Sequence, residues 1–499
     1  MSGFLENMSV GLQVAFTVTN LLYCFIGVFI GTLIGVLPGI GPVGTISILM
    51  PLTFGISPTS AIIMLAGIYY GAQYGGSTTS ILVNIPGEAT SVVTCLDGYQ
   101  MARQGRAGPA LGISAFGSFI AGTIGAIILM FVATPLSSFG LKFGPPEYFS
   151  LIILALSILS YLAHGSMVKA IIMAILGICL SQIGIDVVTG RLRFTFGIID
   201  LQDGLGLVPV VVGLFGVGEV LANLEESTNV EILKAKIKGL LPNLRDWKDS
   251  IGAIFRGSIL GFFLGVLPGG GAIISTFVSY ALEKKISKHP EKFGTGVIEG
   301  VAGPETANNA ASSGAFIPLF TLGLPSNAIT ALLLGALMIH GVAPGPFFIR
   351  KHPDIFWGTI MSMYIGNVML LILNLPLIGL WVKILKVPYK VLFPLLLLLC
   401  IIGSYSINNN KFDVFIMLIF GVIGYLFRKY EYELAPFVIS FVLGPILENS
   451  LRQSLLISQG DISIFFRKPI SMSCLIMALF LLLSPIVLAK SRRLRKKLG

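Results

Sequence analysis

Charged residues are scarce in this sequence. Asp, Glu, Lys and Arg make up 11% of its 499 residues, against about 25% in soluble domains, while hydrophobic residues reach 55%. This composition excludes a water-soluble globule. Unbroken apolar runs, such as Phe393 to Ile402, also lack the alternation of polar and apolar residues found in outer-membrane barrel strands. Helices are therefore the expected spanning elements.

The sequence also lacks the usual patterns of metal and catalytic sites. Its five cysteines are far apart and form no CxxC pair, and its four histidines show no ligand spacing. Gly76-Ser77 lacks the GxSxG context of a hydrolase nucleophile. The stretch from Gly39 to Gly44 matches GxGxxG, but no acidic residue follows about 20 positions later. We therefore expect no cofactor and no enzymatic activity.

Basic residues are missing from the start of the chain and concentrated at its end. No Lys or Arg precedes Arg103, so the first apolar segment lacks the basic region of a signal peptide and should remain as a helix. Six basic residues lie between Lys490 and Lys497. The positive-inside rule places this tail in the cytoplasm, so these charges indicate topology and not nucleic-acid binding. At about 20 residues per span, the apolar content suffices for roughly 13 or 14 spans.

Two halves of the sequence repeat each other. Gly35-Val-Leu-Pro-Gly39 recurs as Gly265-Val-Leu-Pro-Gly269, 230 positions later. Ile85-Pro-Gly87 has a looser match in Leu324-Pro-Ser326, at an offset of 239, and Pro209 matches Pro436 at 227. Three ordered matches at nearly one offset predict an internal duplication.

The charges predict how the two halves are oriented. The first half has no basic residue before its first helix, whereas the second follows a basic segment, so we expect the N-terminus outside and residues 225–256 inside. The predicted fold class is an all-α polytopic membrane protein with two inverted repeats containing broken or re-entrant helices. Breaks are expected at Gly39, Gly41, Gly269 and Gly271. The predicted organisation is a first repeat over 1–224, a basic cytoplasmic linker over 225–256, a second repeat over 257–450, and an extra helix with a basic tail over 451–499.

Each half contains one polar segment interrupted by glycine and proline. Unwound backbone and neutral oxygens at membrane depth suit a carboxylate and a sodium ion, although small residues can also serve helix packing alone. Glu299 to Glu305 fits an interfacial loop equally well, since buried carboxylates are costly. The candidate substrate- and ion-binding residues are Ser77, Thr78, Thr79, Ser80, Asn84, Pro86 and Gly87 from the first segment, and Asn308, Asn309, Ser312, Ser313, Pro325, Ser326 and Asn327 from the second.

A sodium site is expected where amide and carbonyl oxygens gather. We assign it to Asn84, Asn309 and nearby backbone carbonyls, because hard cations prefer oxygen ligands. Sodium is favoured over protons as the coupling ion, since proton relays usually contain chains of acidic residues or histidines.

Several longer motifs resemble a known family. The run from Gly71 to Leu111, the stretch from Ile298 to Ala311, and Ile339-His340-Gly341 with Pro344-Gly345-Pro346 are similar to the large permease subunit of the tripartite tricarboxylate transporters. The resemblance covers roughly residues 15–450. It implies a bacterial inner-membrane symporter that works with a periplasmic solute-binding protein and a small four-helix membrane subunit.

The expected function is secondary active import of an organic tri- or dicarboxylate by cation symport. The alternatives are a channel or exporter of small solutes, and a membrane-embedded enzyme. A channel or exporter would not depend on a periplasmic protein, and an enzyme would need a nucleophile with a base partner.

Overall fold

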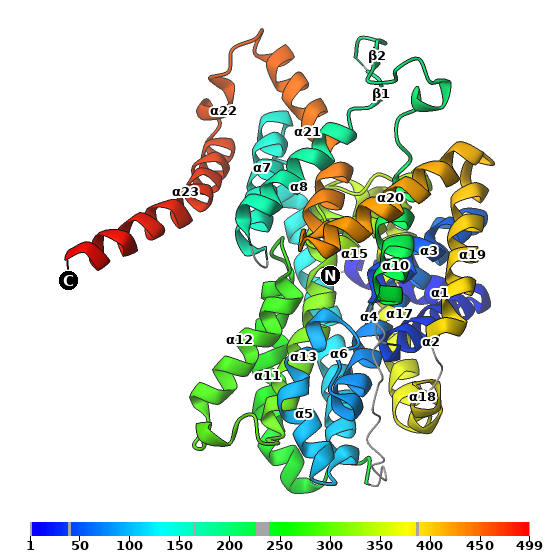
Figure 1. Cartoon of the computed structure of the whole chain (residues 1–499), viewed down its shortest axis with the longest axis vertical. Helices are drawn as coiled ribbons and strands as arrows, with labels where there is room; N and C mark the ends of the chain where they lie inside the picture. The colour runs from blue at the N-terminus through cyan, green and yellow to red at the C-terminus, as the bar shows by residue number, and fades with distance from the viewer. Residues whose placement is uncertain are drawn as a thin grey trace. The chain divides into compact units, whose positions relative to one another are not determined.

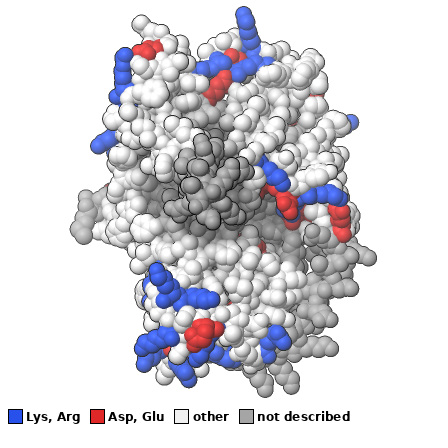
Figure 2. All heavy atoms as spheres, turned by 60° about the vertical axis from the view of Figure 1, so that its left-hand side comes forward, with Lys and Arg blue, Asp and Glu red and all other residues white. Residues whose placement is uncertain are grey.

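The computed structural model describes residues 2–37, 41–163, 166–186, 188–225, 239–385 and 389–498. This part of the chain is almost entirely helical, as predicted from the composition (Figure 1). Six of its helices are long and apolar enough to cross a membrane, and several shorter apolar helices accompany them. The protein is therefore an all-α polytopic membrane protein. Figure 2 shows a face on which most surface atoms belong to neither acidic nor basic residues.

The chain folds as two compact units, each of which combines segments from both halves of the sequence. Unit 1 consists of residues 1–137, 206–267 and 271–429, and unit 2 of residues 138–205, 268–270 and 430–499. Each predicted repeat is one continuous stretch of the sequence, whereas each unit combines three separate stretches. The inverted orientation of the repeats stays a prediction.

Unit 1 contains most of the helices. In chain order they are α1 (Ser2–Ala15), α2 (Val18–Val36), α3 (Gly41–Leu49), η1 (Met50–Gly55), α4 (Pro58–Val83), η2 (Ala89–Ser91), α5 (Thr94–Arg103), α6 (Ala107–Gly140, whose last residues belong to unit 2), α9 (Leu207–Val211), the π-helix η4 (Val212–Val217), α10 (Gly218–Glu225), α11 (Leu244–Gly265), α12 (Gly271–Ile286), η5 (Pro290–Lys292), α13 (Glu299–Gly314), α14 (Phe316–Leu322), α15 (Ala328–Ile339), α16 (Phe348–Lys351), α17 (Pro353–Asn374), α18 (Ile378–Ile384), α19 (Tyr389–Asn408) and α20 (Lys411–Lys429).

Unit 2 is smaller. It contains α7 (Pro145–Leu162), α8 (Met167–Leu180), a two-stranded antiparallel hairpin of β1 (Gly184–Ile185) and β2 (Leu192–Arg193), η3 (Ile199–Leu201), α21 (Leu434–Ile457), α22 (Ile464–Arg467) and α23 (Pro469–Leu498). Gly177 and Gly444 let α8 and α21 approach closely, because a Cβ at Gly177 would lie 2.3 Å from the Phe437 carbonyl oxygen.

Local sequence explains where the central helix α4 begins. Ser57 precedes it and its hydroxyl accepts a hydrogen bond from the Ser60 N–H, which satisfies one of the free donors of the first turn. Pro58 then occupies the first helical position, where its missing N–H costs nothing.

Glycines spaced four apart join α2 to α4. Each added Cβ on α2 would meet a backbone oxygen of α4, so only glycine permits this approach. The contacts are Gly27 with Met64, Gly31 with Ile68 and Gly35 with Ala72, at 2.3, 2.5 and 2.3 Å. Because the residue numbers rise together, the two helices run parallel.

The same packing occurs between α11 and α13. The contacts are Gly257 with Gly303, Gly261 with Ala307 and Gly265 with Ala311, at 2.5, 2.2 and 2.2 Å between the added Cβ and the carbonyl oxygen. Every glycine lies 230 positions after its counterpart on α2, and every carbonyl lies 239 positions after its counterpart on α4. The two offsets found in the sequence motifs therefore extend through two packed helix pairs.

The predicted breaks between these helices lie at turns. Gly41 (φ +64°) opens α3, Gly269 (φ +96°) lies between α11 and α12, and Gly271 begins α12. Gly39 lies outside the described residues. Helices α11 and α12 contact each other and form a hairpin. Of the predicted linker, residues 226–238 are not described, and residues 244–256 belong to α11.

Several basic segments meet at one end of unit 1. Gln104 donates to the Thr295 carbonyl over 2.6 Å, and Arg106 forms an ion pair with Asp246. These contacts join the C-terminal end of α5 to the start of α11 and to the segment around Thr295. Four lysines shortly precede Thr295, namely Lys284, Lys285, Lys288 and Lys292. Part of the segment predicted to be cytoplasmic, residues 225–256, thus lies beside two other basic segments.

Candidate functional site

The two polar segments contain equivalent breaks in the backbone. Helix α4 ends at Asn84, and α14 ends at Gly323, each in the left-handed conformation with φ of 60° and 69°. Glycine, and more rarely asparagine, adopts this conformation at helix ends. A proline follows two residues after each, as Pro86 and Pro325. Both pairs are 239 positions apart, so the breaks are counterparts.

The chain resumes its helical path in the same way after each break. The Glu88 N–H donates to Ser91 Oγ over 3.4 Å, and the Asn327 N–H donates to Thr330 Oγ1 over 3.0 Å. Both capping pairs again differ by 239 positions. The first half places a carboxylate at this position, whereas the second half places a neutral amide.

Glu88 lies in a buried polar cluster and is 9% exposed. The Thr90 hydroxyl donates to its carboxylate, and Asn308 Nδ2 of α13 donates to Oε1 over 3.2 Å. The Gln73 amide lies 2.8 Å from Thr90 Oγ1, and with its nitrogen facing Glu88 it donates to the carboxylate as well. Both halves of the sequence therefore contribute donors to one carboxylate.

Glu305 lies about one helical turn before Asn308 on α13 and forms a second polar cluster. Its side chain is 1% exposed. Three hydroxyls from the first half surround its carboxylate. Ser77 and Thr94 donate to it, and Ser114 donates to Oε2 over 3.2 Å. The segment from Glu299 to Glu305 is therefore the start of a helix and not a loop, and Glu305 is buried within the protein.

No lysine or arginine of the described residues makes an ion pair or a hydrogen bond with Glu88 or Glu305. The nearest basic side chain along α11, Arg256, is held by Glu283 through two hydrogen bonds of 2.8 and 2.5 Å. Two buried carboxylates thus share one polar region without a basic partner, which is an energetically costly arrangement in a membrane protein.

One hydrogen bond ties each break to the opposite half. Asn308 donates to Glu88, while Asn327 Nδ2 donates to the Tyr69 hydroxyl over 3.0 Å. Asn308 lies 239 positions after Tyr69, and Asn327 lies 239 positions after Glu88. The two contacts are therefore exchanged when the halves are exchanged, as expected across a pseudo-two-fold axis.

The remaining candidates on the first segment mostly support packing. Thr79 donates to the Val36 carbonyl over 2.8 Å, and Ser80 donates to two carbonyls. Thr78 is buried within α4, and Pro86 is half-buried. Gly87 permits close contact, because an added Cβ would lie 2.0 Å from the Gly35 carbonyl oxygen.

The second segment divides in a similar way. Asn309 donates to Ser118 Oγ and to the Glu305 carbonyl, over 2.7 and 3.0 Å. Ser312 donates to the Asn309 carbonyl, and Ser313 packs against Gly125. Two buried residues lie in the break itself, Pro325 and Ser326, and the Ser326 hydroxyl has no partner among the described residues.

Asn84 and Asn309, the residues assigned to sodium, do not share a contact in the described structure. Asn84 is exposed, whereas Asn309 is buried. Ser77 meets Glu305 and Gln73 faces Asn308, so α4 and α13 run antiparallel here. Because of this antiparallel direction, Asn84 and Asn309 lie at opposite ends of the contact between α4 and α13. The described part of the chain also contains no group of three His, Cys, Asp or Glu side chains that could hold a metal ion.

Sequence reasoning missed the two carboxylates as site residues. It also missed most of their partners, namely Gln73, Thr90, Thr94 and Ser114. One signal was present, since Glu88 and Glu305 each border a long segment without Asp, Glu, Lys or Arg, residues 7–87 and 306–349. An ionisable residue in such a segment is by default a candidate for function.

A polytopic helical protein with paired helix breaks and buried ionisable groups between them has the architecture of a membrane transporter. The chain belongs to the tripartite tricarboxylate transporter TctA family, whose model matches residues 21–439. It is thus a component of a tripartite transport system that works with other subunits, in a family of transporters and not of enzymes.

Two relatives come from Agrobacterium vitis. The "uncharacterized 52.8 kDa protein in TAR-I ttuC' 3'region" is 50% identical over 479 residues, covering 96% of this chain and 95% of the relative. The "uncharacterized protein in TAR-II ttuC' 3'region" is 53% identical over 215 residues, covering 43% of this chain and 89% of the relative. No solved structure matches the chain.

Proposed function

We propose that this chain imports an organic tri- or dicarboxylate across the bacterial inner membrane by cation symport. An extracytoplasmic binding protein supplies the substrate, and a small membrane subunit accompanies the chain. The observation that carries this proposal is the pair of buried carboxylates, Glu88 and Glu305, beside the two helix breaks and without a basic partner.

Charge explains why the substrate would need a cation. A carboxylate substrate entering this region meets two negative side chains in a poorly solvated environment, where like charges repel strongly. Bound cations remove the repulsion. Substrate and cation therefore bind well only together, which couples their movement.

The ligands around Glu305 favour sodium. Its carboxylate and the hydroxyls of Ser77, Thr94 and Ser114 supply hard oxygens from four helices, α13, α4, α5 and α6. When sodium binds, the hydroxyl hydrogens rotate away and their oxygens face the ion. We therefore place the cation at Glu305 in preference to the pair of Asn84 and Asn309.

The breaks suit the substrate. The backbone N–H groups at the start of α15 follow Asn327 and Ser326, and a helix start favours a carboxylate. The Ser326 hydroxyl, buried and unpaired among the described residues, offers a further donor. If the two halves are inverted, as the basic residues suggest, the site lies at their interface, where alternating access takes place.

The test is sodium-dependent uptake of labelled citrate into proteoliposomes that hold this chain, the small subunit and the binding protein. Glu305→Gln keeps the size of the side chain and one acceptor oxygen but removes its charge. The half-saturating sodium concentration should rise by about 5- to 150-fold, equivalent to ~1–3 kcal/mol for a lost buried polar interaction.

Glu299→Gln is the matched control. Glu299 begins the same helix, α13, but is only half-buried and contacts neither cluster in the described structure. This variant should keep the wild-type sodium dependence. Wild-type sodium dependence in Glu305→Gln would contradict the assignment of the cation, and uptake without any cation gradient would contradict symport.

A further inference from the structure

Unit 2 exposes large apolar side chains on a segment that contains no α-helix. We call residues 184–186 and 188–201 the hairpin loop, which contains β1, β2 and the short 3-10 helix η3 (Figure 1). Phe194, Phe196 and Ile199 are 61%, 84% and 77% exposed. Exposed apolar residues are ordinary on a membrane helix, where lipid covers them, but here the backbone is irregular.

The two phenylalanines are turned outward by an unusual backbone. Phe194 and Phe196 have φ values of 53° and 50°, in the left-handed region that bulky residues rarely adopt. Thr195 between them is buried. The loop thus keeps a small polar residue inside and presents two aromatic rings outside, and such a conformation marks a functional site more often than a packing accident.

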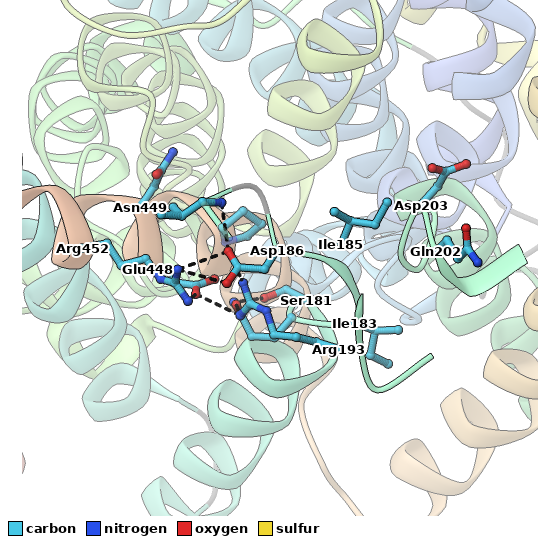
Figure 3. A pocket seen from close by; sticks show the side chains of 13 residues that line it. Ser181, Ile183, Ile185, Asp186, Arg193, Gln202, Asp203, Glu448, Asn449 and Arg452 are labelled. Carbon is cyan, nitrogen blue, oxygen red and sulfur yellow. Dashed lines mark hydrogen bonds and ion pairs between the residues drawn. The ribbon is translucent and has the colours of Figure 1, made fainter. Parts of the chain in front are cut away.

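A closed ring of four ion pairs fixes the hairpin loop to α21. Arg193 pairs with Asp186 and Glu448, both at 2.9 Å, and Arg452 pairs with the same two residues, at 3.1 and 2.7 Å (Figure 3). The residues lie beside a cavity of about 520 Å³. Because the ring joins Asp186 and Arg193 on the loop to one helix, the aromatic side chains are held in place before any partner arrives.

Contacts within unit 2 place the hairpin loop and the basic tail at opposite ends. Ser150, near the start of α7, meets Ser471, near the start of α23, over 2.5 Å. The other end of the unit is marked by Lys169, which donates to the Tyr430 carbonyl over 2.7 Å. Helix α23 packs along α7 and leads its basic residues toward this second end. A cytoplasmic tail therefore sets the loop on the extracytoplasmic side.

Lipid does not explain the exposed rings. Irregular backbone leaves N–H and C=O groups that cannot face hydrocarbon. Two charged side chains close to the rings in sequence are also exposed, Arg191, three residues before Phe194, and Asp203, two residues after the loop. A patch of aromatic residues with opposite charges at its rim matches the anatomy of a protein interface.

We propose that the hairpin loop is the surface on which the soluble extracytoplasmic binding protein docks, an inference that rests on the proposed function. Phe194 and Phe196 would fill an apolar hollow on that protein. Arg191 and Asp203 would pair with an acidic and a basic residue at its edge. The partner recognised here is a soluble protein that carries the substrate, and the loop recognises the protein and not the substrate.

The experiment measures binding of the purified binding protein from the same gene cluster to the full chain with its small subunit in nanodiscs. Phe196→Ser and Phe194→Ser should each weaken binding at least about tenfold, as for aromatic residues at the centre of an interface. Phe466→Ser is the control, because Phe466 is a similarly exposed phenylalanine of unit 2 outside the hairpin loop. Wild-type affinity in both loop variants would overturn the proposal.

Uptake separates this proposal from the proposed function. At saturating binding protein, Phe196→Ser should reach the wild-type maximal rate of sodium-driven citrate uptake. Wild-type uptake together with unchanged affinity of the loop variants means that the docking surface lies elsewhere, while absence of uptake by the wild type overturns the symport proposal itself.

Two further measurements test whether the bilayer or the small subunit covers the loop instead. The first uses a fluorescent probe attached at Phe196→Cys, in a chain without its native cysteines. Quenching by brominated lipid would show that the bilayer covers the loop. Loss of the small subunit on purification of Phe196→Ser would show that this subunit covers it. Either result overturns the proposal.

Discussion

Asp186 shows how a single carboxylate can hold an exposed segment. Hydrogen bonds from the Thr189 hydroxyl and the Val188 N–H, together with Arg193 and Arg452, hold the pKa of Asp186 well below its usual range, against the opposing effect of burial. The carboxylate therefore stays charged over the whole physiological range, and its contacts persist in mildly acidic surroundings.

The stability that Asp186 supplies depends on pH in a defined direction. The pKa of Asp186 is lower in the folded state than in the unfolded state, where it is about 3.9. The stabilisation by Asp186 is therefore complete above the unfolded-state pKa and is lost as pH falls through the folded-state pKa. Limited proteolysis of the hairpin loop should thus be equally slow at pH 7 and pH 5. Asp186→Asn should be cleaved faster at both values. Faster cleavage of the wild type at pH 5 would contradict this account.

At the scale of elements, the glycine stripes decide how closely the helices approach. A Cβ at Gly261 would lie 2.2 Å from the Ala307 carbonyl oxygen, so an alanine there must push α11 from α13. We expect Gly261→Ala to destabilise the protein by about 1–3 kcal/mol, as overpacked residues do. The measurement is thermal unfolding of the detergent-solubilised chain, followed by its elution as a folded monomer or oligomer.

Gly379 on α18 provides the control for this substitution. An added Cβ there meets nothing within 4 Å, and the residue has no positive φ. Gly379→Ala should therefore unfold at the wild-type temperature. An equal loss in the two variants would show that helix flexibility, and not close packing, is the reason for the glycines.

Sequence patterns predicted the repeated and broken segments better than the contacts between side chains of the two halves. The repeated Gly-Val-Leu-Pro-Gly motif and the loosely matched Ile-Pro-Gly identified the two helix pairs and the two breaks, because backbone geometry depends on a few glycines and prolines. Which side chains meet across the halves was not predictable. Ser77 and Glu305 are 228 positions apart, and nothing local to either residue specifies the other.

The same limit applies to Asn84, whose role as a ligand stays a prediction. Its left-handed φ of 60° shows that the residue ends a helix. An asparagine suits both tasks, so the sequence alone does not distinguish them. The division into compact units was also hidden, because each unit combines distant segments.

The whole molecule is expected to have one orientation in the membrane. The segments near Gln104, Asp246 and Thr295 meet at one end of unit 1 and carry most of its basic residues. An impermeant thiol reagent added to intact spheroplasts should therefore label Phe196→Cys and leave Lys288→Cys unlabelled, each in a cysteine-free background. Lys288→Cys should become reactive once the membrane is permeabilised. Labelling of both positions from outside would contradict the inverted arrangement of the halves.

The reciprocal contacts of the two breaks have an evolutionary consequence. In a symmetric dimer of identical half-length chains, both contacts would carry the same residues, and a carboxylate at one would appear at the other as well. Joining the halves in a single gene frees the two copies to diverge. One copy carries Glu88, while its counterpart Asn327 is neutral. Fusion therefore allows a single charged position where an assembly of identical subunits would be obliged to have two.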